Sequence, residues 1–401
     1  MIACTPAGAS LERKAEARVW LARAREFADE VVRPLGRVLD RMEAQSAVAA
    51  DSPVRDFLVQ AHREGYTRLS DSRQKGGIGL PAAAEYLVLE ELAAADAGLA
   101  VLLCSSPIPF RWAGAASLGP PAREVSLPYF RGERLDWIGC AAVTERTRFR
   151  ALADSGGWLL SGRTGWVPGA AIATHAAIAC TAQAGGSVRC ALAIVPLERW
   201  GVTRSSALDE LGLRTEARAR LVLDRVRLAG DELLVAPSAS LGIVAAATVL
   251  DHLVHAIAAV GIGRAAYEGA VRVVRERVHT GTPPADNERA TRLLFRLFTL
   301  HEAARALTRS AFMHTGREAG CDNAAIQQAS AAHSFSIEVA RNVVDGAMEL
   351  CARSADARGV VEYLDGSTFQ PEKLLRDAQS CKFAPAESDS HAPLDAVAVY
   401  P

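Results

Sequence analysis

The sequence predicts an α+β protein with an N-terminal α-helical domain, a central antiparallel β barrel or sandwich, and a C-terminal four-helix bundle. Its 401 residues are too many for one compact core and suit two or three domains. Helix-forming residues dominate both ends of the chain, whereas the middle is a series of short apolar runs separated by Gly, Asp and Pro. This order divides the chain into domains at 1–120, 121–236 and 237–385, with a tail at 386–401.

The first domain carries helical signals that are interrupted by glycine. Residues 15–39 are rich in Ala, Glu, Arg and Leu, and a second helix is expected at 53–64, ending at Gly65. The run QKGGIGLP predicts an irregular turn, because its three glycines can adopt backbone angles closed to other residues. The segment AAAEYLVLEELAAADAGLAVLL that follows predicts one strong buried helix.

In the middle domain, strands are predicted at the runs DWIGCAAV, GWLLSG, THAAIACTA, RCALAIVPL and ARLVLDRVRL. In the last run, apolar and charged residues alternate on either side of Asp224, which predicts either two half-buried strands or one bulged strand. Because no helix separates the runs, we expect an antiparallel sheet.

Long helices return from Pro237 to about 353. The first of them carries an apolar stripe at helical spacing, formed by Leu250, Leu253, Val254, Ile257 and Val260. The run GTPPADN at 281–287 ends this helix, and a second break at 320–322 precedes the next one. Helices of this length and pattern favour a bundle.

Composition and charge exclude several classes of protein. The formal net charge of −1 gives no electrostatic reason to expect a nucleic acid or an anionic membrane as the main partner. No uninterrupted apolar run reaches the ~18 residues of a membrane span. The N-terminus lacks the basic segment and apolar core of a secretory signal, so we expect a cytoplasmic location. The eight cysteines form no CxxC pair and no zinc-finger spacing, so no metal site is expected.

Six local motifs resemble those of the acyl-CoA dehydrogenase superfamily. GGIGL before LEELA is similar to the family's GGxGL turn and its LEELA helix, AAVTER to the start of ALTEPxAGSD, and SGRTGWVPGA to NGxKxWITNA. LDELGLRTEARARLVLDRVRL is similar to LGLR…F(D/E)xVRVP, RERVHTGTPPADNE to ERxxFGxPIxxxQ, and EKLLRDAQ to ERLLRDAK. The motifs run in order over nearly the whole chain. The resemblance implies FAD in a crevice between the β domain and the C-terminal helices, an acyl-CoA or acyl-carrier-protein substrate, and a homo-oligomer, either dimer or tetramer.

Four residues match family positions that contact the flavin. The resemblance places Thr144 at the pyrimidine edge of the flavin and Trp166 along its ring. Pro168 stands where the family has a Thr or Ser that hydrogen-bonds near the reactive flavin nitrogen, and proline offers neither a hydroxyl nor an N–H. Arg277 matches the arginine that reaches the FAD pyrophosphate of a partner subunit.

Other flavin positions depart from the family pattern. Arg146, Arg148 and Arg150 replace the small residues and serine that cradle the pyrophosphate, and they form either phosphate contacts or a solvated cationic face. Thr280 replaces a phenylalanine, and Ala352-Arg353 replaces a glycine pair. FAD is therefore expected to be held weakly or to be lost.

Both family positions for the catalytic base lack a proton acceptor, because they carry Pro385 and Leu253. Asp251 and His255, four residues apart on one helix face, form a possible carboxylate–imidazole pair, although a structural role for Asp251 is an alternative. Further carboxylates and a histidine follow in the tail at Glu387, Asp389 and His391, where a solvated role is the alternative.

Three functions remain open at this point. The first is a flavin oxidoreductase that acts on an acyl thioester in a specialised pathway, with an atypical or absent base. The second is a flavin monooxygenase on the same fold, which needs no base for an α proton. The third is a non-redox member that has lost FAD and binds an acyl group, catalyses a rearrangement or serves as a scaffold.

Overall fold

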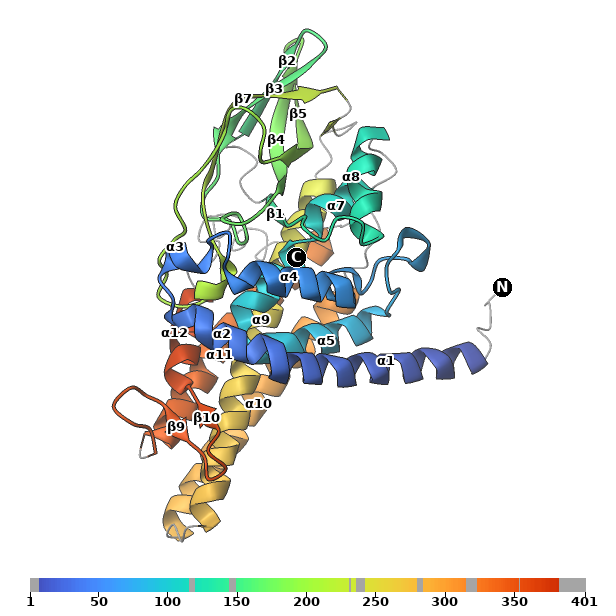
Figure 1. Ribbon diagram of the computed structural model, residues 1–401. Helices are drawn as coiled ribbons and strands as arrows, with labels where there is room; N and C mark the ends of the chain where they lie inside the picture. The colour runs from blue at the N-terminus through green and yellow to red at the C-terminus, as the bar shows by residue number, and fades with distance from the viewer. Residues whose placement is uncertain are drawn as a thin grey trace, which may run out of the picture.

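The computed structural model describes residues 7–114, 120–143, 149–230, 232–235, 242–279, 284–314, 323–352 and 354–381. The fold is α+β, with helical N- and C-terminal parts and a mostly antiparallel central sheet, as predicted. Figure 1 shows the sheet at one end, the N-terminal helices across the middle and the long C-terminal helices at the other end. The domain boundaries near 120 and 236 stay predictions. A helix, α8, begins at Pro120, where the β domain was expected to start, and residues 236–241 lie outside the described part.

The N-terminal part is a set of helices joined by short turns. The helices are α1 (Ala7–Phe27), α2 (Arg33–Arg41), α3 (Ala44–Ala47), α4 (Pro53–Glu64), α5 (Ala82–Ala95), α6 (Ala97–Ser105), α7 (Ile108–Ala113) and α8 (Pro120–Phe130), with a π-helical turn, η1 (Ala28–Val32), between α1 and α2. The expected helix at 53–64 is confirmed. The side chain of Ser52 caps its start by accepting from the Val54 amide, and Gly65 ends it with a φ of 96°.

The prediction of a single buried helix after the glycine-rich turn is wrong, because the helix is interrupted at Asp96. Asp96 has extended backbone angles of −156° and 116° and separates α5 from α6. Its carboxylate accepts from the amide of Leu99 at 2.9 Å, which makes it the N-cap of α6. Helix propensity alone does not reveal this break, because an aspartate inside a helix and one at a cap look the same in a sequence.

The central sheet has eight strands within the described residues. They are β1 (Gly139–Ala142), β2 (Phe149–Asp154), β3 (Gly157–Arg163), β4 (His175–Ala184), β5 (Ser187–Pro196), β6 (Val202–Arg204), β7 (Leu221–Ala229) and β8 (Leu233–Val235). Their order is β6-β7-β3-β2-β4-β5-β8, and β1 pairs with β4. The prediction of a purely antiparallel sheet is wrong at two places, because β4 runs parallel to both β1 and β2. Residues 221–229 form one strand with a register shift against β3, so the bulged alternative holds.

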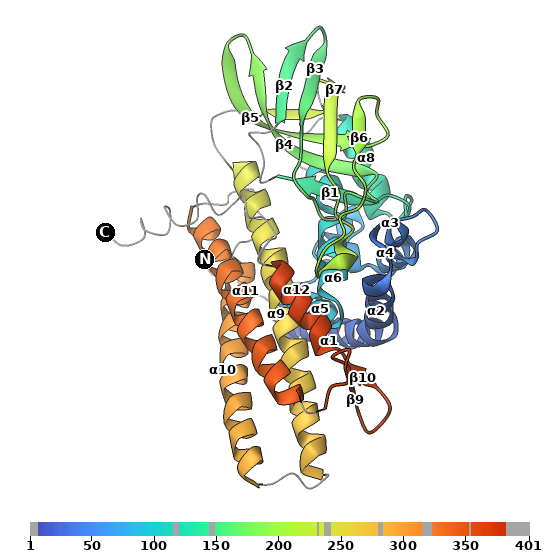
Figure 2. The same ribbon diagram turned by 90° about the vertical axis from the view of Figure 1, so that its left-hand side faces the viewer.

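Three long helices make up most of the described C-terminal part: α9 (Gly242–His279), α10 (Pro284–His314) and α11 (Asn323–Cys351). A small hairpin, β9 (Val361–Glu362) and β10 (Thr368–Phe369), precedes α12 (Pro371–Cys381), and Figure 2 shows α12 beside α9. Gly261 lets α9 approach α5, because a Cβ at this position would stand 2.4 Å from the carbonyl carbon of Ala93. Thr248–Glu276 is apolar and long enough to cross a membrane, but 78% of its apolar window is buried, as in the core helix of a bundle.

A buried charge cluster joins α12 to the N-terminal helices. The ammonium of Lys373 lies 2.9 Å from a carboxylate oxygen of Asp96 and 2.6 Å from one of Asp377. Asp96 also accepts from the Thr215 hydroxyl at 2.6 Å, and Asp377 accepts from the Leu213 amide at 2.7 Å. Although burial opposes the charged ammonium, the two carboxylates raise the pKa of Lys373.

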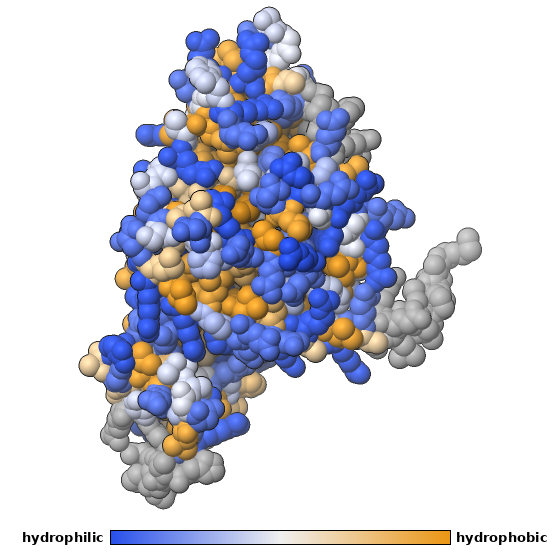
Figure 3. Space-filling model, viewed as in Figure 1, coloured by the Kyte–Doolittle hydropathy of each residue, from blue (hydrophilic) through white to orange (hydrophobic). Residues whose placement is uncertain are grey.

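On the face of the molecule seen in Figure 3, hydrophilic residues surround separate hydrophobic patches.

Candidate functional site

Trp166 lies in the connection between β3 and β4, which is held against the connection that precedes β7. The amide of Val167 donates to the carbonyl oxygen of Ala219 at 3.0 Å, and the amide of Gly169 donates to the carbonyl oxygen of Glu216 at 2.8 Å. Gly169 takes a φ of 75°, a backbone angle that favours glycine. These contacts fix the place of the half-buried Trp166 ring at the edge of the sheet.

Arg220 covers one face of the Trp166 ring. Its guanidinium carbon stands 4.3 Å from the ring centroid, which is a cation–π distance. Ser205 holds the backbone of Arg220, because its hydroxyl accepts from the Arg220 amide at 2.9 Å and its amide donates to the Arg220 carbonyl at 2.9 Å. Within the described ranges, no carboxylate comes within ion-pair distance of this guanidinium.

Sequence reasoning missed Arg220, because its closeness to Trp166 depends on strand pairing. The two residues lie 54 positions apart and become neighbours through the antiparallel bridge between Val167 and Ala219. That bridge sets the residue before Val167 opposite the residue after Ala219. Alternation in the run ARLVLDRVRL located the strand but carried no information on its partner.

In its described part, this region offers an aromatic surface against which a flavin ring can stack, and a positive charge. It offers few free hydrogen-bond donors. Pro168 has neither an N–H nor a hydroxyl, and the amides of Val167 and Gly169 are already bonded to carbonyl groups. The remaining features that suit a flavin nucleotide are the half-buried Trp166 ring and the guanidinium of Arg220. These residues therefore fit a flavin that is held by stacking and by charge.

Several residues singled out from the sequence lie outside the described part of the chain. They are Thr144, Arg146, Arg148, Thr280, Arg353, Pro385, Glu387, Asp389 and His391. Arg277 belongs to α9, but its side chain is not among those described. Arg150 is described, as an exposed residue of β2 opposite Ser161. The roles expected for all of these residues stay predictions.

Asp251 and His255 lie one turn apart on α9, but their side chains are not hydrogen-bonded to each other. The Nδ1 atom of His255 stands 2.9 Å from the backbone carbonyl oxygen of Asp251 and 3.7 Å from a carboxylate oxygen of the same residue. The Nε2 atom of His255 is buried and finds no hydrogen-bond partner among the described residues. In this arrangement the Nδ1 atom lies nearer to the backbone carbonyl oxygen than to the carboxylate, and the catalytic role of the pair stays a prediction.

The His255 ring belongs to a cluster of three histidines between α9 and α11. His333 stacks on His252 with centroids 5.0 Å apart and meets His255 edge to face at 6.1 Å. His252 also lies 3.1 Å from the hydroxyl of Ser330. Burial, followed by the nearby charges of His255 and His252, lowers the pKa of His333 well below its usual value. This cluster directs His255 toward α11, and no pattern in the sequence indicates that His333 joins it.

Leu250 supplies an apolar side chain where the described part of α9 meets the β domain. Leu250 packs against a cluster that includes Val143 and Ile194 of that domain. Leu253, one of the two family positions for the base, lies on another face of α9, where it packs with Ala311 of α10 and with residues of α11. Neither leucine supplies a proton acceptor to the boundary between the helices and the sheet.

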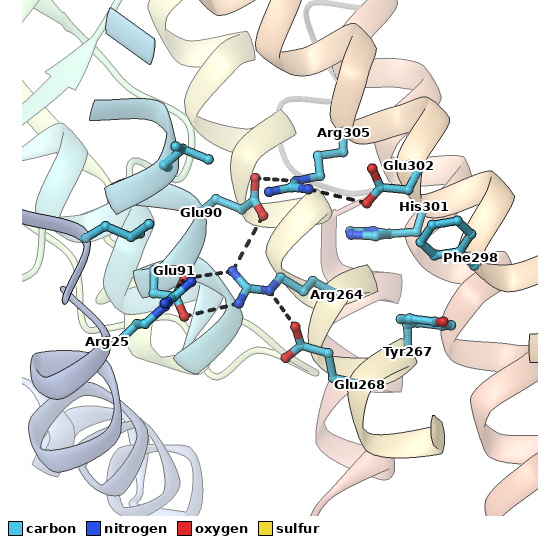
Figure 4. A pocket seen from close by; sticks show the side chains of 12 residues that line it. Arg25, Glu90, Glu91, Arg264, Tyr267, Glu268, Phe298, His301, Glu302 and Arg305 are labelled. Carbon is cyan, nitrogen blue, oxygen red and sulfur yellow. Dashed lines mark hydrogen bonds and ion pairs between the residues drawn. The ribbon is translucent and has the colours of Figure 1, made fainter. Parts of the chain in front are cut away.

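A cavity of about 290 Å³ lies between α1, α5, α9 and α10 (Figure 4), but ion pairs occupy its polar groups. Glu90 is bonded to Arg305 at 2.8 Å, and Arg264 is bonded to Glu91 at 3.0 Å and to Glu268 at 2.8 Å. These pairs tie three helices together and leave few free donors or acceptors. A second cavity, of about 440 Å³, lies where α4 meets the β domain.

Comparisons with known proteins agree with this architecture. Family models for the N-terminal and C-terminal domains of acyl-CoA dehydrogenase match residues 14–109 and 242–384. The amino sugar nitrososynthase DnmZ of Streptomyces peucetius is 29% identical over 290 residues, which cover 68% of this chain and 70% of the relative. The structure of butyryl-CoA dehydrogenase from Megasphaera elsdenii superposes with a TM-score of 0.77 at 17% identity, covering 96% of this chain and 98% of that one.

A further solved structure with the same fold was determined with a flavin bound. KijD3, in complex with FMN and dTDP-3-amino-2,3,6-trideoxy-4-keto-3-methyl-D-glucose, superposes with a TM-score of 0.69 at 23% identity. The match covers 98% of this chain and 92% of that one. At this identity the likeness shows the fold alone.

Proposed function

The chain belongs to the acyl-CoA dehydrogenase superfamily, and on that premise we propose that it is a flavin-dependent oxygenase of a specialised pathway. The observation that carries this proposal is the set of side chains that α9 carries where it meets the β domain. Leu250 presents an apolar side chain there, and the side chains of the predicted acid–base pair, Asp251 and His255, are not hydrogen-bonded to each other. A reaction that begins by removing an α proton needs a positioned base.

Oxygen transfer does not require the protein to supply a positioned base for an α proton. A reduced flavin, if bound beside Trp166, would supply the two electrons that, with two protons, allow one atom of molecular oxygen to enter the substrate and the other to leave as water. A substrate atom with a free electron pair, such as an amine nitrogen, accepts oxygen without a prior loss of an α proton. In this proposal Thr144 and Trp166 hold the flavin ring, Arg220 and Arg277 contribute positive charge, and the apolar face at Leu250 limits the access of water.

The relatives support the same choice. DnmZ is named an amino sugar nitrososynthase, and KijD3 was solved with FMN and an amino sugar nucleotide. A third protein of this fold, FkbI, is described as acting in the biosynthesis of the methoxymalonyl extender unit of a polyketide. The descriptions of DnmZ and KijD3 make an amine-bearing substrate in specialised metabolism the first class to test.

A second candidate is the oxidation of an acyl thioester bound to coenzyme A or to a carrier protein. It is favoured by the family match over both helical domains and by the high coverage of the butyryl-CoA dehydrogenase structure. It would require a base from Asp251 with His255, or from the residues that follow α12. A non-redox role that has lost the flavin is the third alternative, because Pro168 removes a polar contact expected at the flavin.

Two mixing experiments separate these functions. The protein is loaded with FAD or FMN, and the flavin absorbance is followed after straight- and branched-chain acyl-CoAs are added without oxygen. We expect no rapid bleaching, because Leu253 and Pro385 occupy the two family positions for the base and neither offers a proton acceptor. The flavin is then reduced and mixed with ¹⁸O₂ and a nucleotide-linked amino sugar, and we expect ¹⁸O in the product. Rapid bleaching by an acyl-CoA would favour the dehydrogenase, and failure to bind either flavin would favour the non-redox role.

A further inference from the structure

The 440 Å³ cavity between α4 and the β domain is lined by two cations that lack an acidic partner in the described structure. Arg55 projects from the first turn of α4, and Arg204 is the last residue of β6. Within the part of the chain that the structure describes, neither guanidinium comes within ion-pair distance of a carboxylate. The other arginine of this cavity, Arg134, is different, because Asp136 accepts from it at 3.0 and 2.9 Å.

Both of these guanidinium groups are held in place by one turn of the backbone. Arg204 donates to the carbonyl oxygens of Ala171 and Ala173 at 2.9 and 2.5 Å. Arg55 donates to the carbonyl oxygen of Ile172 at 3.4 Å and to that of Ala49 at 3.4 Å. A guanidinium has five N–H donors, so each of the two retains donors beyond these contacts. The turn therefore holds two cations near one another at the cavity.

The closeness of the two cations is unfavourable without a ligand. Burial lowers the pKa of Arg55 and also that of Arg204, and the charge of Arg55 lowers the pKa of Arg204 further. Arg55 is half-buried and Arg204 is exposed, and an anion beside both guanidinium groups would reduce the repulsion between them. Two guanidinium groups in fixed positions suit a ligand with phosphate groups, because a guanidinium binds phosphate oxygens in a bidentate way.

The other walls of the cavity supply aromatic surface. The rings of Trp137 and His175 lie 4.7 Å apart between centroids, both residues line the cavity, and the Arg134 guanidinium covers part of the Trp137 ring at 4.4 Å from its centroid. Burial, followed by the charge of Arg134, lowers the pKa of His175 to about 4, so its ring is neutral near pH 7. Glu198 is the remaining acidic residue of the lining besides Asp136, and it stands on the β5–β6 connection. The volume lies within the range of about 300–1,000 Å³ for small-molecule sites, which are frequent between domains.

We propose that this cavity binds a phosphorylated small molecule of the nucleotide class, with its phosphate groups at Arg55 and Arg204 and its ring beside Trp137. The inference does not depend on the proposed oxygenase activity, because it rests only on residues that line this cavity.

The test is calorimetric titration of the purified full-length protein with four probes: inorganic phosphate, pyrophosphate, ADP and adenosine. We expect ADP and pyrophosphate to bind more tightly than phosphate, and adenosine to bind least. Arg55→Gln and Arg204→Gln should each weaken ADP binding by about tenfold or more, since a hydrogen bond to a charged group is worth that much. Arg163→Gln, at an exposed β3 arginine outside the cavity lining, is the matched control and should leave the affinity unchanged.

Two further variants keep the test decisive if Arg204→Gln fails to fold. Arg204→Lys keeps the charge and should retain most of the ADP affinity, whereas Glu198→Gln removes a carboxylate from the lining and should strengthen ADP binding a few-fold. Equal binding of ADP to the wild type and to Arg55→Gln would overturn the proposal. Binding of adenosine as tight as that of ADP, or no response to any probe at millimolar concentration, would overturn it as well.

Discussion

Several buried charges in the helical body of the protein are paired with opposite charges, whereas three arginines at the boundary of the β domain lack an acidic partner among the described residues. In the body, Lys373 lies between two aspartates and Arg264 forms ion pairs with three glutamates. At the boundary, Arg220 stacks on an indole, and Arg55 and Arg204 donate to backbone carbonyl groups. The first arrangement stabilises the fold without a ligand. The second leaves positive charge available to an anionic cofactor or ligand, so function is to be sought at this boundary.

The largest expected effect concerns histidines that are kept neutral by burial. Burial is the main cause that lowers the pKa values of His62, His175 and His301 to about 4. Because these rings take up protons near pH 6.5 in the unfolded chain, they stabilise the fold fully above that pH, and this stability is lost as the pH falls toward 4. We expect the free energy of unfolding to fall by several kcal/mol in total, at about 1.4 kcal/mol per pKa unit for each ring.

Urea denaturation at pH 7, 6 and 5 measures this loss and avoids the range in which exposed carboxylates titrate. His301→Gln removes one of the rings and should make the pH dependence shallower, while the exposed His314→Gln serves as the matched control on the same helix. A free energy of unfolding that stays flat from pH 7 to 5 would show that these rings are not held neutral by burial.

The second prediction tests whether charge in the helical body is compensated as the contacts indicate. Lys373→Met leaves Asp96 and Asp377 buried without their cation, and we expect a loss of about 3–5 kcal/mol in the free energy of unfolding. Arg292→Gln breaks an exposed pair with Glu288 on α10 and should cost only about 0.3–0.5 kcal/mol. Chemical denaturation of both variants at pH 7 gives the comparison, and equal losses would contradict the contrast between the buried and the exposed pair.

Much of the fold was predictable because local signals decide it. The cap at Ser52, Pro53 at the start of α4 and Gly65 at its end fix one helix within the chain itself. The break at Asp96 was missed because its cap becomes evident only through bonds to Leu99 and Thr215, the second of which is distant in sequence. The parallel pairing of β4 was missed for a similar reason, since alternation in a strand carries no information on the direction of its neighbour.

The candidate site was predictable only in part. Trp166 could be placed by motif, but Arg220 enters the site through strand pairing and His333 approaches His255 through helix packing. Spacing along α9 correctly set Asp251 and His255 one turn apart, yet spacing does not determine which atoms meet. The imidazole contacts a backbone carbonyl group at 2.9 Å, and the carboxylate lies farther away at 3.7 Å.

The third prediction concerns flavin affinity at the uncompensated boundary. With Pro168 and the replaced phosphate contacts, two lost hydrogen bonds at ~1–3 kcal/mol each would weaken FAD binding by roughly a hundredfold relative to a typical member of the family. Arg220→Gln should weaken it by about a further tenfold, because it removes the cation from the Trp166 ring. Arg189→Gln, an exposed arginine on β5, is the control. Quenching of flavin fluorescence gives the dissociation constants, and full FAD occupancy after purification without added cofactor would contradict the expectation.

The smallest effect is expected at the exposed apolar side chains of the C-terminal helices, through which we predict a homo-oligomer, either dimer or tetramer. On α10, Phe295 is 70% exposed and Met313 is 47% exposed, and such side chains commonly become buried when chains associate. Phe295→Asp should shift the monomer–oligomer equilibrium toward monomer by about tenfold, since one buried aromatic ring contributes about 1.5–3 kcal/mol of burial. Trp200→Asp, at an 84% exposed ring of the β domain, is the matched control and should leave the equilibrium unchanged. Light scattering across micromolar concentrations measures the shift. If the wild type remains monomeric throughout, the prediction of a homo-oligomer is wrong. If both variants dissociate equally, the interface does not depend on Phe295 of α10.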